Sequence, residues 1–355
     1  MALSLRFYRI YETGNEVDLD KLEQYLSESH SISRVRFSRV KTSSIIMEAR
    51  PLLLNLDPAR IQTEEWGELS FSARAKIYDI GTISICLHHE RNTDERGLLE
   101  KLSLYFADQE GLDDIFAGYL KSVKEILAHS TDVNAIDPDF YEDYNLYWTS
   151  YPDPESDPVV VLMGEKIDFS PAMRSEILKN SLSYSNNDFA IVSWDTAWLC
   201  DTEDPTDLVD LIEYANAQLM QLRFHDTQLS LQMESMYEHL DSADRMLRWQ
   251  RLRKYHLIMN QLMEVHAEIT ETIEKIQNLI KITEDVYYAR VYAATLNVLR
   301  TSQWTESVQR KLDVIHRNYT MLSNEVNIQH SNFLEWMIII LIALEFGWAI
   351  WQTLF

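Results

Sequence analysis

The absence of proline from Thr206 to Phe355 is the feature that most constrains the fold of this chain. Gly347 is also the only glycine in that stretch. Because proline removes a backbone donor and clashes with the preceding turn, so long a stretch without it favours helix throughout. Pro205 and Asp207 are residue types that helix starts prefer. The sequence therefore predicts a helical C-terminal half that begins at about residue 205.

The apolar residues of this half step mostly by three and four positions, as they do along the contact line of packed helices. One series is Tyr255, Met259, Leu262, Val265, Ile269, Ile273, Ile276 and Ile280, and the other is Val308, Leu312, Ile315, Tyr319, Leu322 and Val326. The spacing is compatible with a hairpin of helices within one chain or with a coiled coil between chains. We expect residues 205–332 to form a bundle or coiled-coil-like stalk, and the protein to be a homo-oligomer.

The first half of the chain mixes strand and helix patterns. Strands are predicted at 3–11, 35–40, 44–47, 70–78, 82–87, 189–194 and 198–200, and helices at 19–28, 94–128 and 171–180, with Gly111 dividing the second helix. Three prolines between Ser150 and Pro158 predict a loop. The fold class is therefore α+β. We expect one head domain over 1–204, because two smaller domains would each have too little core.

The C-terminal segment 333–355 is rich in Ile, Leu and Trp. Twenty helical residues from Trp336 would span roughly 30 Å, the thickness of a bilayer's hydrocarbon core. Trp336 lies near one end, and Trp348 and Trp351 towards the other, as interfacial aromatic residues do. Glu345 lies within the run, and we expect it to face a partner helix. The sequence thus predicts a tail anchor, and the alternative is a buried helix in the core of an oligomer.

Charge limits the partners and the location that we expect. The formal net charge of −24 disfavours nucleic acid as a partner and leaves apolar burial as the means of lipid binding. The N-terminal residues lack the pattern of a cleavable signal, so we expect the body on the cytoplasmic side of a membrane. Cys86 and Cys200 are expected to be free thiols, and a disulfide between them is the alternative.

No catalytic, cofactor or metal motif can be identified in the sequence. Gly-rich phosphate loops, HExxH and GxSxG are absent. His88 and His89 are adjacent on a predicted strand, where they would point to opposite faces and could not share a metal ion. The prediction is that the protein binds no cofactor and no metal, and enzymatic activity is not favoured.

The end of the helical half resembles a known family. The segment from Leu312 to Met321-Leu322, followed by the segment 330–345, is similar to the "required for meiotic nuclear division" family, most closely over 312–345. Tyr78 and Gly81 resemble its Tyr-Gly element. The resemblance implies an α+β domain, a helical half and membrane association, in a prokaryotic relative at the plasma membrane. Its signature positions, with the two further tryptophans of the anchor, are His330, Leu334, Glu335, Trp336, Glu345, Trp348 and Trp351.

The leading functional hypothesis from the sequence is a membrane-tethered scaffold that self-associates through its helical half. The alternatives are an enzyme or ligand-binding head held at the membrane, and a soluble oligomer whose apolar tail is a core helix.

Overall fold

The computed structural model describes residues 1–14, 16–28, 36–39, 50–109, 111–128, 136–203, 205–244 and 286–354, with separate residues between 255 and 274. The predicted strand at 44–47 and half of the apolar series at 255–280 lie outside these residues, while the four described members, Tyr255, Met259, Ile269 and Ile273, are buried together in one apolar core. The described chain divides into two compact units. The first contains Met1–Phe224 and Lys275–Thr305, and the second contains His225–Glu274 and Glu306–Phe355. The domain boundaries predicted from the sequence, at 204/205 and 332/333, stay a prediction.

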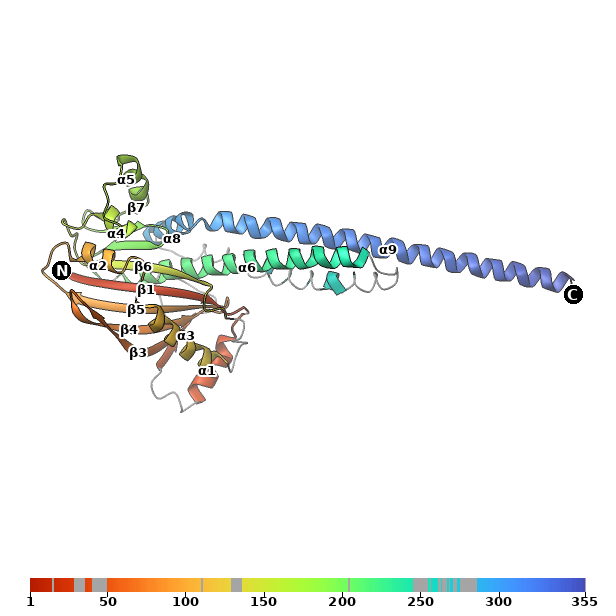
Figure 1. Ribbon diagram of the computed structural model, residues 1–355, viewed down its shortest axis with the longest axis horizontal. Helices are drawn as coiled ribbons and strands as arrows, with labels where there is room; N and C mark the ends of the chain where they lie inside the picture. Colours follow the sequence, from red (N-terminus) through yellow and green to blue (C-terminus); the bar gives the residue numbers. More distant parts are fainter. Residues whose placement is uncertain are drawn as a thin grey trace. The chain divides into compact units, whose positions relative to one another are not determined.

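A mixed sheet forms the centre of the first unit (Figure 1). The strands described are β1 (Ala2–Glu12), β2 (Arg36–Arg39), β3 (Leu52–Thr63), β4 (Gly67–Ile77), β5 (Thr82–Asn92), β6 (Tyr141–Thr149), β7 (Ser181–Leu182), β8 (Phe189–Val192) and β9 (Thr196–Cys200). Their order across the sheet is β2-β3-β4-β5-β1-β6-β9-β8-β7. The pair β6–β9 is parallel and the other pairs are antiparallel. This confirms the predicted α+β class.

Helices cover both faces of the sheet. They are α1 (Leu19–Glu28), α2 (Leu98–Tyr105), α3 (Asp113–Leu127), α4 (Pro158–Met163), α5 (Pro171–Leu178), α6 (Thr206–Asp244), α8 (Val286–Val298) and α9 (Thr301–Leu354). One core contains buried residues of α1, α2, α3 and α4 against the sheet. The other contains the first turns of α6 and part of α8 against the opposite face. The central strand β1 is therefore buried on both faces.

Ion pairs as well as apolar packing join α6 to the sheet. Lys76 on β4 donates to Asp210 and Glu213 on α6, each over 2.7 Å. The exposed fractions of these three side chains are 12%, 12% and 3%. Burial alone would lower the pKa of Lys76, but the two carboxylates outweigh it and raise the pKa above its ordinary value, so the amine is protonated. α6 thus begins as part of the head's core.

The second unit contains the rest of α6 and most of α9. Its core includes Leu229 and Met236 from α6 and four residues of the predicted apolar series on α9, namely Val308, Leu312, Ile315 and Leu322. Asp226 accepts hydrogen bonds from Ser307 Oγ over 2.7 Å and, at its backbone oxygen, from Lys311 Nζ over 2.8 Å. The predicted series on α9 is therefore the line along which that helix packs in this unit.

Candidate functional site

The residues predicted from the sequence as the site all lie on α9, in its C-terminal part. The side chains of Glu335, Trp336, Glu345 and Trp348 are exposed, while those of His330, Leu334 and Trp351 lie outside the described side chains. The structure therefore places the candidate residues on one helix, and the four whose side chains are described all face solvent.

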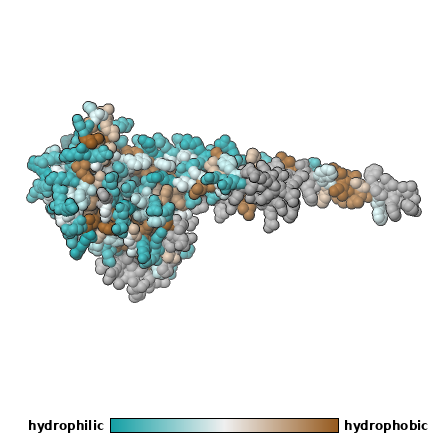
Figure 2. Space-filling model, viewed as in Figure 1, coloured by the Kyte–Doolittle hydropathy of each residue, from teal (hydrophilic) through white to brown (hydrophobic). Residues whose placement is uncertain are grey.

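Between Glu335 and Glu345 the helix carries nine apolar residues. The large ones are exposed by between 43% and 64%: Trp336, Met337, Ile338, Ile339, Ile340, Leu341, Ile342 and Leu344. Figure 2 shows hydrophobic side chains gathered on this part of the helix. Successive helical residues are rotated by about 100°, so this consecutive run exposes apolar surface on every side of the helix. We call residues 336–344 the apolar band.

The prediction of a membrane anchor at 333–355 is wrong. In the part of the chain that the structure describes, no helix is both long enough and apolar enough to cross a bilayer. The apolar band has a carboxylate at each end, and nine residues extend only about 14 Å, against about 30 Å of hydrocarbon. The predictions of a lipid partner and of a membrane location depended on this anchor, so they are wrong as well.

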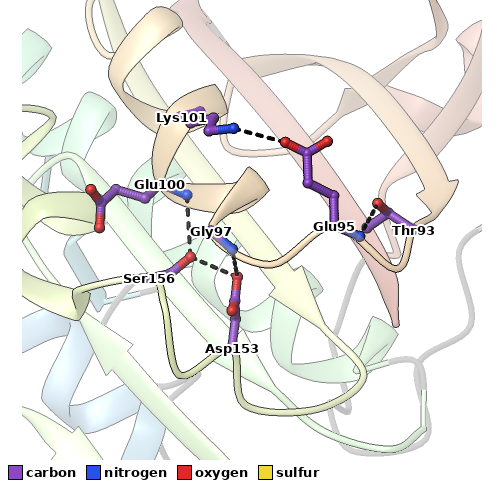
Figure 3. A network of polar contacts seen from close by, with 7 residues as sticks. All are labelled: Thr93, Glu95, Gly97, Glu100, Lys101, Asp153 and Ser156. Carbon is purple, nitrogen blue, oxygen red and sulfur yellow. Dashed lines mark hydrogen bonds and ion pairs between the residues drawn. The ribbon is translucent and has the colours of Figure 1, made fainter.

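A second region with organised polar chemistry lies in the head, where α2 and α4 begin (Figure 3). Asp153 accepts hydrogen bonds from the Gly97 backbone over 2.9 Å and from Ser156 Oγ over 2.8 Å. Ser156 Oγ accepts from the Glu100 backbone, and Glu100 accepts from the Asp157 backbone over 2.9 Å. Each helix start is thereby held by side chains that belong to the other. This arrangement fixes α2 against α4 and has a structural role.

The other ends of α2 and α4 form the walls of a pocket of about 90 Å³. Strand β6 and the turn before β9 complete it, and its lining residues are Ser103, Ala107, Asp108, Asn145, Tyr147, Val161, Met163, Gly164, Glu165, Asp195 and Thr196. Gly164 has φ +63°, and a Cβ there would lie 2.5 Å from the Cβ of Ala107. Glycine thus permits α4 to end in close contact with α2.

The adjacent histidines lie on β5, as predicted, and take different partners. His88 Nε2 is 2.9 Å from Ser4 Oγ, and His89 Nδ1 is 2.9 Å from the Ser70 backbone oxygen. Burial lowers the pKa of His88 to about 3, and Arg6 and Arg74 on neighbouring strands add to this effect. Among the described residues no group of His, Cys, Asp or Glu is arranged to hold a metal ion.

Both cysteines are free thiols, as the sequence predicts. Burial raises the pKa of the Cys86 thiol to about 12 and that of Cys200 to about 11. A thiol with so high a pKa carries almost no thiolate at neutral pH. Neither cysteine is therefore an activated nucleophile.

Comparison with known proteins gives the family. The family model described as "Uncharacterized protein MJ0711, N-terminal domain" matches residues 2–206. The chain belongs to this family. It is also similar to "Uncharacterized protein MJ0711" of Methanocaldococcus jannaschii, with 28% identity over 294 residues that cover 80% of this chain and 82% of the relative. No solved structure matches. These matches confirm a relationship to a family described as uncharacterized, and they contain nothing on meiotic nuclear division.

Proposed function

We propose that this member of the MJ0711 family is a self-associating interaction protein, in which the apolar band of α9 packs against the bands of further copies of the chain. The observation that carries the proposal is the exposure of eight large apolar side chains in one consecutive run. Monomeric proteins rarely leave so continuous an apolar surface in water. One neighbouring helix covers only one side of such a band, so we expect more than two chains in the assembly.

The flanking residues support an assembly in which copies align side by side. Glu335 and Glu345 limit the band at both ends, and they are exposed to solvent in the single chain. Carboxylates at both ends resist sliding of one band past another, because a shifted register would place a charge against apolar side chains. We further propose that residues 312–345 are related to the "required for meiotic nuclear division" family, and this relationship implies no catalytic activity.

The test is the mass of the full-length chain in solution. We expect sedimentation or light scattering at micromolar concentration to give a mass above that of one chain, which is 41.7 kDa. The double variant Ile339→Glu/Ile342→Glu places two charges on the band, and it should lower the mass towards one chain. Met321→Glu is the matched control, because Met321 is an exposed apolar residue (59%) of the same helix outside the band.

Two results would contradict the proposal. One is a full-length chain that sediments as a monomer across the accessible concentration range. The other is an assembly that survives the double variant unchanged. Helical content measured by circular dichroism must be equal in all three proteins, since a melted helix would also lower the mass.

A further inference from the structure

The pocket between the ends of α2 and α4 has chemistry that assembly through α9 does not use. Three carboxylates line it, from Asp108, Glu165 and Asp195, and no Lys, Arg or His is among its described lining residues. Partial desolvation raises the pKa of Asp195, and the neighbouring charges of Asp143 and Asp108 raise it further. Negative charge that no local cation balances favours a positively charged ligand.

Tyr147 gives independent support for a ligand. Its side chain is only 1% exposed and lines the pocket, yet its hydroxyl has no hydrogen-bond partner among the described residues. The Asp195 carboxylate lies close enough to act on the phenol, and together with burial it raises the pKa of Tyr147. By contrast, Tyr144 on the same strand donates to the Ser193 backbone oxygen. The hydroxyl is not among the fully buried atoms without a partner, so it opens into the pocket, where water or a ligand can pair with it.

The other polar groups of the pocket are already engaged. Asn145 donates from Nδ2 to the Ala107 backbone oxygen over 3.0 Å and accepts at Oδ1 from Gln109 Nε2 over 2.9 Å. Thr196 Oγ1 donates to Asp195 Oδ1 over 3.2 Å. The second Asp195 oxygen and the Tyr147 hydroxyl therefore remain to receive hydrogen bonds. A donor that carries positive charge and several N–H or O–H groups matches these acceptors.

Size and geometry narrow the class of ligand. A cavity of about 90 Å³ holds several waters, whereas cofactors and nucleotides need pockets of about 300–1,000 Å³. The carboxylates are also not gathered closely enough to hold a bare metal ion, since no such group occurs in the described part of the chain. A small organic cation has donors that point in several directions, and it can reach acceptors that are further apart.

We propose that the pocket binds the primary ammonium group of a small alkylamine. Asp195 is its main counter-ion, and the Tyr147 hydroxyl accepts one of its N–H groups. Asp108 and Glu165, which are exposed as Asp195 is, attract the cation and add to the negative field. The contacts between the starts of α2 and α4 hold these walls in place, so the pocket is formed before the amine arrives. The inference does not depend on assembly through the apolar band.

The test is calorimetric titration of the full-length chain with ethylammonium chloride at constant ionic strength. We expect saturable binding of one ethylammonium per chain. Tetramethylammonium has the same charge but no N–H donor, and it should bind at least about tenfold more weakly. Asp195→Asn should weaken ethylammonium binding about tenfold or more, and Tyr147→Phe by about threefold to tenfold. Asp94→Asn, which removes an exposed carboxylate that does not line the pocket, should leave the affinity unchanged.

Tyr147→Phe keeps the ring in the core and so answers the question even if Asp195→Asn fails to fold. Four results would overturn the inference: no saturable heat of binding, equal affinity for tetramethylammonium, no effect of Tyr147→Phe, or tighter binding of calcium chloride in competition with the amine. The first of these would mean that water alone fills the pocket.

Discussion

Removing the Lys76 amine should destabilise the first unit strongly. The substitution Lys76→Met keeps a long apolar stem but leaves Asp210 and Glu213 without the cation that each contacts over 2.7 Å. Removal of one partner from a buried ion pair typically costs about 3–5 kcal/mol, because a charge remains buried without compensation. A domain is stable by only about 5–15 kcal/mol, so the loss should be large.

The assay is urea unfolding of the full-length chain, followed by tryptophan fluorescence. Trp148 and Trp198 are buried in the first unit and report on its integrity. The matched control is Arg60→Met, which breaks an exposed pair with Glu68 at 3.4 Å, and it should cost no more than about 1 kcal/mol. The triple variant Lys76→Met/Asp210→Asn/Glu213→Gln removes the unbalanced charge and should recover most of the stability that Lys76→Met loses.

The same cluster predicts a dependence on pH. Burial raises the pKa of Glu213, and Lys76 opposes that rise. Without Lys76, the pKa of Glu213 in the folded state lies further above its unfolded value. Such groups favour the folded state below the unfolded pKa, and this contribution is lost as pH rises through the folded pKa. The deficit of Lys76→Met should therefore shrink from pH 7.5 to pH 5.

Two observations would refute this reasoning. If Lys76→Met costs no more than Arg60→Met, the cluster contributes little to holding α6 on the sheet. If the triple variant is no more stable than the single one, unbalanced charge is not the cause of the loss.

Three further predictions concern the head. Burial lowers the pKa of His88 to about 3, so the stability that its neutral imidazole contributes is complete above about pH 6.5 and is lost as pH falls. Between pH 7.5 and pH 5 this loss amounts to at most about 2 kcal/mol. The variant His88→Gln should not show the loss, which is measured as the shift in urea midpoint between the two pH values. Gly164→Ala should lower the melting temperature, because φ +63° and a 2.5 Å approach to Ala107 both oppose a Cβ; an unchanged melting temperature would contradict the close contact. Asp153→Ala should cost about 1–3 kcal/mol in urea unfolding, since the Gly97 and Ser156 donors lose their acceptor; a loss within 0.5 kcal/mol, the range typical of surface substitutions, would show that water replaces it.

Much of the sheet can be predicted from local pattern, and the exceptions have local causes. Strand β4 alternates buried and exposed residues along most of its length, so its period is visible in the sequence. Strand β3 was missed because Pro58 interrupts it, and the register shifts between Leu56 and Ala59 to accommodate the proline. Strand β6 was missed because Glu142 and Asp143 lower its strand propensity. Glu142 is nevertheless buried there, where it pairs with Arg223 of α6.

The helical half shows what the spacing of apolar residues can predict and what it cannot. A spacing of three and four residues locates α6 and α9, but the same pattern suits packing against a sheet or against a helix. α6 does both: residues such as Ile212 and Ala215 pack on the sheet, while Leu229 and Met236 belong to the second unit. The predicted anchor failed for a related reason. The prediction treated 333–355 as one apolar segment although Glu335 and Glu345 lie within it, and these two carboxylates shorten the uninterrupted apolar run to residues 336–344.

The pocket could not be predicted from the sequence at all. Its lining residues come from separate elements between Ser103 and Thr196, and each is an ordinary residue in its local context. Tyr147 has the pattern of a core aromatic residue, and only the three-dimensional structure shows that its hydroxyl lacks a partner. Asp195 has the pattern of a turn residue between β8 and β9. A binding site made from unremarkable residues leaves no motif, so the lack of catalytic and cofactor motifs did not argue against a ligand.

The extent of the matches bears on whether head and helices act together. The family model ends at residue 206, where α6 begins, which alone would suggest a head joined to an unrelated helical segment. The similarity to the protein of Methanocaldococcus jannaschii extends over 294 residues, which is more than the head contains, so it must include much of the helical half. The structure supplies a physical reason for that continuity. Asp210 and Glu213 neutralise Lys76 from just beyond the matched domain, and Ile212 closes the core above the sheet. A chain cut at residue 206 would leave Lys76 and the apolar residues of β1 and β6 on the α6 side of the sheet open to water. We therefore expect the head to fold only together with the first turns of α6.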